Sequence, residues 1–174
     1  MKYKDIADPT ILEKLKKSNI DISKFEVTNG EYVDIRKFIK ELTPFQIKEE
    51  PMYRHESKVE GNDIIINSCN NEDMKRFFIA YEFVKTLSKT TKQENNKPTG
   101  LNQFLASFFT KQDATNLLLP DDLRDKLIKQ IINEEGFRDK VITDSMKRII
   151  VRKLSEKAIA PMGLVVDQIS RYHF

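Results

Sequence analysis

Apolar side chains recur at helical spacing along several stretches of the chain, and these stretches define the expected elements. Ile11, Leu12 and Leu15 alternate with lysines and predict a short amphipathic helix over Pro9–Ser18. A second helical run follows Asp34 and ends at Pro44, because proline cannot continue a helix. The strongest stripe predicts a central helix over Arg76–Leu87 and consists of Phe77, Ala80, Phe83, Val84 and Leu87.

The second half of the chain is also predicted to be helical. Polar residues at positions 68–73 offer N-caps for the central helix, and a polar loop is expected over Ser88–Gly100. In the next helix, Leu101–Asn116, we expect the side chains of Leu105, Phe108 and Phe109 to point inward. Further helices are expected at Leu123–Glu134, with Asp121 or Asp122 as its cap, at Asp144–Lys157, and from Pro161 to Tyr172.

The region between the second and the central helix has strand patterns. Apolar and polar residues alternate over Phe45–Glu49, Met52–Glu60 is extended and polar, and Asp63–Asn67 is rich in β-branched residues. The Glu60–Asp63 segment has the composition of a turn between antiparallel strands. We therefore expect an α+β fold, a single helical domain over residues 1–174 with a small antiparallel sheet before the central helix, whose outer face is polar.

Composition narrows the classes of function only slightly. The net charge of +3 comes from 30 basic and 27 acidic residues spread along the chain, so it cannot by itself support nucleic-acid binding. No apolar run is long enough for a signal peptide or a membrane span, so we expect a cytoplasmic protein without a membrane partner. The single cysteine, Cys69, excludes an internal disulfide and any cysteine-based zinc cluster, and is expected to be a small buried or loop residue.

One arrangement of motifs resembles a known family. The strand Asp63–Asn67 precedes a helix with the sequence Arg-Phe-Phe-Ile-Ala-Tyr-Glu-Phe-Val-Lys from Arg76 to Lys85. Farther along the chain stand Leu-Leu-Leu-Pro-Asp, ending at Asp121, and Ile-Ala-Pro, ending at Pro161. In this order and spacing, over about Phe25–Tyr172, they resemble the ImmA/IrrE family of zinc metallopeptidase-like proteins, in which the helix reads R-F-x-x-A-H-E-x-x-H.

The zinc ligands of that family are missing. Histidines at i and i+4 lie on one helix face and chelate zinc, and the glutamate between them is the general base. Here these positions are Tyr81, Glu82 and Lys85, and only the glutamate remains. The family's third ligand, a glutamate on the next helix, falls at or near Ser107, and serine is a poor zinc ligand. Neither of the two histidines, His55 on an expected strand and His173, has a second histidine four residues on. We therefore expect no metal and no cofactor.

Two interpretations of Tyr81, Glu82 and Lys85 remain open. They lie either on a solvated helix face with a Glu82–Lys85 contact, or in a relict cleft where Lys85 supplies the positive charge once provided by the metal. Such a cleft could still bind a peptide. Separately, the basic face of the Asp144–Lys157 helix, followed by a second helix, resembles a helix-turn-helix and is a candidate for DNA contact through Lys147, Arg148, Arg152 and Lys153.

The leading hypothesis is a pseudo-metallopeptidase, a non-catalytic bacterial regulatory protein that binds another protein. The resemblance implies a partner of the helix-turn-helix repressor type, encoded on a phage or other mobile element. The alternatives are a zinc-dependent endopeptidase with an unconventional metal site, and a DNA-binding transcriptional regulator.

Overall fold

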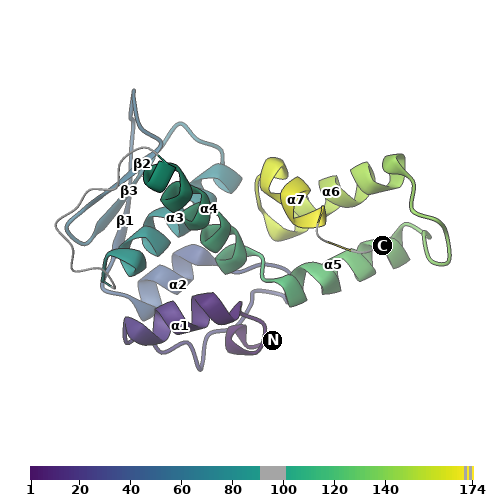
Figure 1. Ribbon diagram of the computed structural model, residues 1–174, viewed down its shortest axis with the longest axis horizontal. Coiled ribbons are helices and arrows are strands. Elements are labelled where there is room, and N and C mark those ends of the chain that lie inside the picture. Colours follow the sequence, from purple (N-terminus) through teal and green to yellow (C-terminus); the bar gives the residue numbers. More distant parts are fainter. Residues whose placement is uncertain (91–100, 171, 173) are drawn as a thin grey trace.

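The chain folds as an α+β protein, as predicted (Figure 1). The computed structural model describes residues 1–90, 101–170, 172 and 174, without the side chains of residues 89, 90 and 101–104. Most of the expected Ser88–Gly100 loop, His173 and the Phe104 side chain therefore lie outside the described residues. The described elements are a 3₁₀ helix (Tyr3–Asp5), α1 (Pro9–Lys17), α2 (Ile35–Leu42), β1 (Gln46–Glu50), β2 (Ser57–Glu60), β3 (Asp63–Asn67), α3 (Glu72–Thr90), α4 (Leu101–Leu118), α5 (Asp121–Glu134), α6 (Asp144–Ala158) and α7 (Met162–Ile169).

Short polar side chains cap the N-termini of α2 and α3. The Asp34 carboxylate accepts a hydrogen bond from the Lys37 amide at 3.0 Å and caps α2, the helix expected after this residue. Asn71 caps α3 through the Met74 amide at 3.4 Å, within the polar segment expected to supply the cap of this helix. The expected Asp121 or Asp122 cap of α5 is wrong, because both aspartates lie in the first turn of the helix and Pro120 precedes it.

The three strands form a mixed sheet in the order β1-β3-β2. β2 and β3 are an antiparallel hairpin whose turn includes Gly61 at φ +60°, as the Glu60–Asp63 sequence predicted. The all-antiparallel expectation is wrong for β1, which pairs in parallel with β3. β3 lies between the two preceding strands, parallel to β1 and antiparallel to β2. Strand patterns do not encode this order, because it depends on which strands become neighbours.

The outer face of the sheet is largely polar. Lys48 and Lys58 flank Ile65 in register, so their side chains share one face of the sheet. Lys48 bonds Asp63 at 2.5 Å and Lys58 bonds Glu60 at 2.8 Å on this face. Ile64 and Ile66 point the other way, and both are fully buried in the core.

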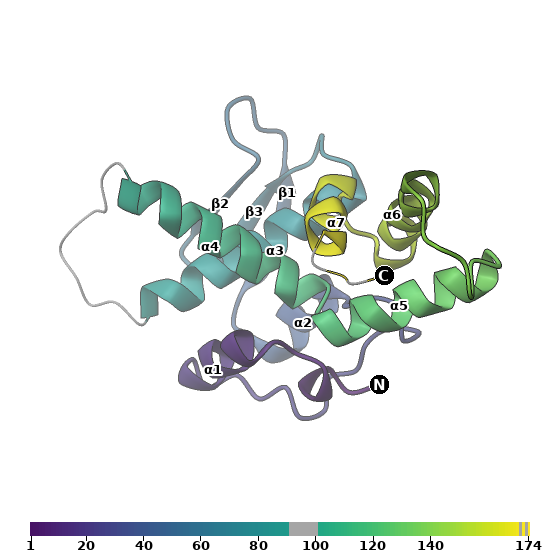
Figure 2. The same cartoon turned by 45° about the vertical axis from the view of Figure 1, so that its right-hand side comes forward.

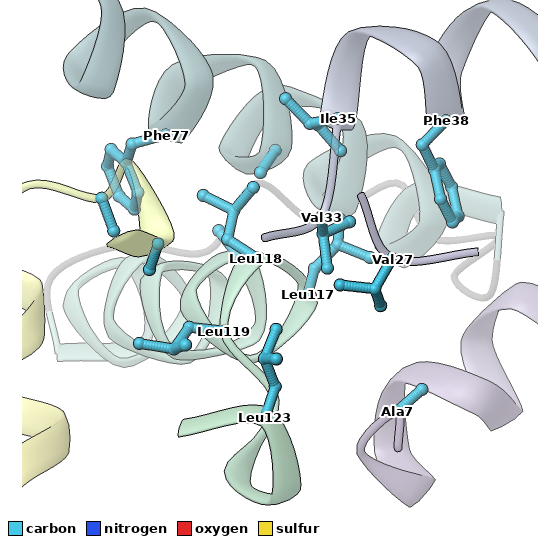
Figure 3. Close-up of a cluster of buried hydrophobic side chains, with 14 of the residues drawn as sticks. Ala7, Val27, Val33, Ile35, Phe38, Phe77, Leu117, Leu118, Leu119 and Leu123 are labelled. Atoms are coloured by element: carbon cyan, nitrogen blue, oxygen red, sulfur yellow. The ribbon is translucent and has the colours of Figure 1, made fainter. Parts of the chain in front are cut away.

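Helix α3 lies at the centre of the fold, between the sheet and helices α2 and α4 (Figures 1 and 2). Phe83 is completely buried, and its ring packs edge-to-face on Phe38 at 5.8 Å and on Phe45 at 6.3 Å between centroids. One hydrophobic cluster joins side chains from distant segments, Val33, Phe38, Leu117 and Leu123 among them (Figure 3). The predicted central helix therefore forms the middle of this cluster.

Helix α4 contacts α3 through a different face from the one expected. Ala114 and Leu117 are fully buried, and the half-buried Ser107 and Thr110 precede them on the same face. Leu105, Phe108 and Phe109, expected to point inward, are 39%, 51% and 57% exposed. The expectation failed because the buried stripe of α4 carries Ser107, Thr110, Ala114 and Leu117 rather than the aromatic side chains.

Helices α5, α6 and α7 follow α4 and lie to one side of the sheet (Figure 1). The α6–α7 turn contains Ile159 in the left-handed region at φ 47°. α7 ends at Ile169, earlier than the predicted Tyr172, and the buried Gln168 accepts a hydrogen bond from Arg124 of α5 at 3.1 Å. Within the described part of the chain, none of the helices is long and apolar enough to cross a membrane.

Candidate functional site

The strand-to-helix connection before α3 is built around Asn67. This residue ends β3 and is only 8% exposed. Its amide oxygen accepts hydrogen bonds from the backbone N–H groups of Met52 at 3.2 Å and Cys69 at 3.1 Å, and its amide nitrogen donates to the Met52 carbonyl at 3.0 Å. Asn67 therefore braces both the β1–β2 loop and the turn that leads into α3.

Arg76 fixes the beginning of the motif helix. Arg76 is 4% exposed, and its guanidinium donates to the Val33 carbonyl at 2.7 Å and stacks over the Tyr32 ring at 4.8 Å from the centroid. Burial lowers the pKa of Arg76 from its ordinary value, and the negative charge of Asp34 opposes that shift. The arginine of the motif thus ties α3 to the segment before α2.

Glu82 is held in a closed arrangement. Its side chain is 2% exposed, and each carboxylate oxygen has its own partner: Oε1 accepts from the Ser57 hydroxyl of β2 at 2.9 Å, and Oε2 accepts from the Lys85 ammonium at 2.8 Å. The side chain of Lys85 is 42% exposed, so the ion pair has a buried anion and a partly solvated cation. A buried carboxylate needs such partners, because burying an unpaired charge is costly.

This geometry changes both interpretations of the motif. The predicted Glu82–Lys85 contact is present, but Glu82 does not lie on a solvated face. Both interpretations include a Lys85–Glu82 ion pair, so its presence does not distinguish between them. Nothing in the sequence around α3 indicated the Ser57 partner, because it comes from a strand 25 residues earlier.

Tyr81 and Lys85 share one side of α3. The Lys85 Nζ atom lies 5.6 Å from the Tyr81 ring centroid, and the Tyr81 ring lies 6.0 Å from the Phe77 ring. The two positions that carry histidines in the resembling motif are therefore one helical turn apart and close in space. Ser107 is half-buried on the side of α4 that is directed toward α3, and the structure gives no hydrogen bond between it and Tyr81, Glu82 or Lys85.

Metal-binding side chains are not gathered at any described position. Among residues 1–90, 101–170, 172 and 174, no group of three or more His, Cys, Asp or Glu side chains is arranged to hold a metal ion. His55 is exposed in the β1–β2 loop rather than on a strand, which corrects the prediction, since β2 begins only at Ser57. Cys69 is exposed in the turn before α3.

The basic side chains of α6 are engaged with nearby carboxylates. Lys147 pairs with Asp144 at 3.5 Å, Arg152 pairs with Glu156 at 3.9 Å, and Lys153 pairs with Glu135 of the preceding segment. Arg148 is exposed, and no ion pair involves it within the part of the chain that the structure describes. Three of the four candidate DNA contacts thus have an acidic neighbour, which reduces the positive field that a phosphate backbone would meet.

Sequence patterns missed a surface on α4. Leu105, Phe108 and Phe109 form an exposed apolar face, named here the α4 face, and the rings of Phe108 and Phe109 contact each other at 5.9 Å. A pocket of about 260 Å³ lies where Phe108 and Lys111 of α4 meet Leu164 and Asp167 of α7. The small residues Ser107, Thr110 and Ala114 share the opposite stripe of the helix, and this pattern could have identified the α4 face as the outer one.

Comparisons with known proteins add no family to the features described above. No protein-family model matches the chain, and no curated protein matches its sequence.

Proposed function

We propose that this chain is a non-catalytic protein-binding module, a pseudo-metallopeptidase of the ImmA/IrrE-like kind. The partner that the resemblance implies is a helix-turn-helix repressor or another regulatory protein of a phage or mobile element, which would act in the bacterial cytoplasm. The observation that carries the binding role is the α4 face, where two half-exposed phenylalanines and a leucine are contiguous. Exposed aromatic clusters of this kind commonly mark protein-binding surfaces.

The loss of catalysis is supported by the state of Glu82. A general base must reach a metal-bound water or a substrate proton, but both Glu82 oxygens are occupied and the side chain is buried. Lys85 also opposes a zinc ion at this position, since an ammonium repels a dication and has no lone pair to donate. These facts favour the binding role over a peptidase with an unconventional metal site. The ion pairs of α6 likewise favour it over DNA contact.

Purified wild-type protein is expected to contain well under one equivalent of zinc after purification without chelator. Tyr81 and Lys85 occupy the positions of two ligands, and Ser107 the neighbourhood of the third. Elemental analysis by mass spectrometry measures the metal directly. A ratio near one that disappears in a folded Glu82→Ala variant would support the peptidase instead.

Removing the aromatic side chains of the α4 face is expected to weaken partner binding strongly. Wild-type protein immobilised on a resin and incubated with extract of the native host should retain a partner, which mass spectrometry then identifies. The purified partner should also bind the purified wild-type chain directly. The double variant Phe108→Ser/Phe109→Ser should lose at least about tenfold in affinity, the amount expected when two hot-spot aromatics are removed.

Val141→Ser provides the matched control for this experiment. Val141 is 90% exposed in the α5–α6 connection, so the variant also removes an exposed apolar side chain, but away from the α4 face. It should bind as the wild type does. Equal retention of the partner by the wild type and the double phenylalanine variant would contradict a binding role for the α4 face.

A further inference from the structure

Among the described residues, no strand pairs with the outer side of the β1 backbone. β1 is an edge strand, because the sheet order is β1-β3-β2. The Gln46 amide donates to the Asn62 carbonyl at 2.8 Å, and the Glu50 carbonyl accepts from the Ser68 amide at 2.9 Å, so both of these residues face β3. Backbone groups alternate in direction along a strand, so Ile47 and Glu49 present their N–H and C=O groups to the open edge.

A groove runs beside the first half of this edge. It has a volume of about 530 Å³ and is lined on one side by Arg36, Ile39 and Lys40 of α2 and on the other by residues 43–47. Phe45 and Ile47 are half-buried and contribute apolar surface to it. The groove thus combines the free backbone groups of Ile47 with an apolar wall, which are the two features that bind an extended peptide by strand addition.

Among the residues that line the groove, Lys40 carries the charge that no described carboxylate offsets. The lining includes two cations, Arg36 and Lys40, and no carboxylate. The Arg36 guanidinium bonds Glu49 at 2.7 Å and Glu72 at 3.2 Å, so its charge is already offset. Lys40 is exposed, and the structure gives it no ion pair within the described ranges. A ligand with a carboxylate beside Lys40 would therefore complement the groove.

A network of ion pairs holds the edge in place. The Glu49 carboxylate forms ion pairs with Lys75 of α3 at 2.7 Å and with Arg36 of α2, so β1 is linked to both helices. The hydrogen bond from Lys75, followed by that from Arg36, lowers the pKa of Glu49 from its ordinary value. The strand is thus held in position before any ligand arrives, which reduces the ordering cost of binding.

We propose that the groove between α2 and the free edge of β1 binds an extended, acidic peptide segment of another protein, which adds a fourth strand beside β1. The segment's backbone pairs with the N–H and C=O groups of Ile47, and an Asp or Glu side chain pairs with Lys40. The groove uses none of the residues of the α4 face or of the Glu82 site. Binding here is therefore independent of the function proposed above.

Nuclear magnetic resonance titration tests this directly, because it detects weak binding residue by residue. The probe is a synthetic nonamer of alternating Thr and Val with two central glutamates, and its counterpart carries lysines in their place. The acidic nonamer should shift the Ile47 amide signal and slow its hydrogen exchange, while the Gln46 and Lys48 amides, which face β3, remain protected throughout. The lysine nonamer should do neither.

Charge reversal on α2 provides the decisive pair of variants. Lys40→Glu should weaken the acidic nonamer roughly tenfold, as expected for the loss of a charge-assisted contact, and should favour the lysine nonamer. Lys37→Glu makes the same change on the same helix, at an exposed residue that does not line the groove, and should leave binding unchanged.

Three results would overturn the assignment. The first is an Ile47 amide that neither nonamer affects at millimolar concentration. The second is an equal effect of the two lysine substitutions on binding. The third is concentration-dependent protection of Ile47 without any peptide, accompanied by a dimer in sedimentation, which would show that the edge pairs with a second copy of the chain instead.

Discussion

Replacing Phe83 with alanine is expected to lower the free energy of unfolding by about 3–5 kcal/mol, the usual cost of removing a buried aromatic ring. Phe83 is fully buried at the centre of α3 and packs on the rings of Phe38 and Phe45, which come from α2 and from the start of the sheet region. The cavity left by its ring would therefore separate three elements. Urea unfolding followed by circular dichroism measures the change.

Phe109→Ala is the matched control, since it removes the same ring from an exposed position. Phe109 is 57% exposed on the α4 face, so its loss should change the unfolding free energy by no more than about 0.5 kcal/mol. If both variants lost the same stability, the two phenylalanines would have equivalent surroundings, and the placement of α3 at the centre of the core would be wrong.

The contrast between these two phenylalanines also shows what sequence patterns could and could not predict. The stripe through Phe77, Phe83 and Leu87 placed the central helix correctly, because each of these side chains is large and the helix is surrounded by other elements. On α4 the same rule assigned Phe108 and Phe109 to the core, although small side chains pack there instead. Periodicity identifies a helix face, but which face is buried depends on how closely the neighbouring helix approaches.

The strands illustrate a second limit of sequence patterns. Residues 57–67 form the hairpin that the Gly61 turn predicted, since a two-residue connection leaves little choice of partner. β1 pairs with β3 and not with β2, its neighbour in the sequence. No short turn connects β1 to β3, so the sequence carries no local signal for their parallel pairing. The core contribution of Tyr3, whose hydroxyl donates to the Leu117 carbonyl at 3.0 Å, was hidden for the same reason.

At the candidate site, helical geometry correctly predicted that Tyr81 and Lys85 lie on one side of α3 and that Glu82 contacts Lys85. The burial of Glu82 and its bond to Ser57 could not be predicted, because they depend on where β2 crosses the helix. For the energetics of this ion pair, the burial of Glu82 is more important than the contact itself. An exposed Glu–Lys pair contributes little to stability, whereas a buried carboxylate has to keep its partners.

The second large effect is a gain of metal binding when the three missing ligands are restored. The triple variant Tyr81→His/Lys85→His/Ser107→Glu is expected to bind about one zinc ion per chain, whereas the wild type is expected to bind well under one equivalent. Histidines one turn apart on α3 can chelate zinc at about 2.0–2.1 Å, and a glutamate on the facing side of α4 can supply the third ligand. Isothermal titration with zinc measures the stoichiometry and the affinity.

A second triple variant separates a designed site from adventitious binding by new histidines. It carries the same two histidines with Ala106→Glu in place of Ser107→Glu. Ala106 is exposed and lies about 100° around α4 from its neighbour, so its carboxylate cannot face α3 in the same way. This variant should bind zinc more weakly, because two histidines alone leave the tetrahedral site one ligand short.

The triple variant should also change the surroundings of Glu82, because it removes the lysine that bonds this carboxylate. Removing Lys85 frees the Oε2 atom of the carboxylate while Ser57 still holds Oε1, so one oxygen would face the metal-bound water. Zinc lowers the pKa of such a water, and Glu82 could then accept its proton as a general base. Peptidase activity is a separate matter from metal uptake, because it also requires an open substrate cleft. Metal uptake depends only on the backbone positions of α3 and α4, so a correctly folded triple variant that takes up no zinc would remove the main structural support for a pseudo-metallopeptidase.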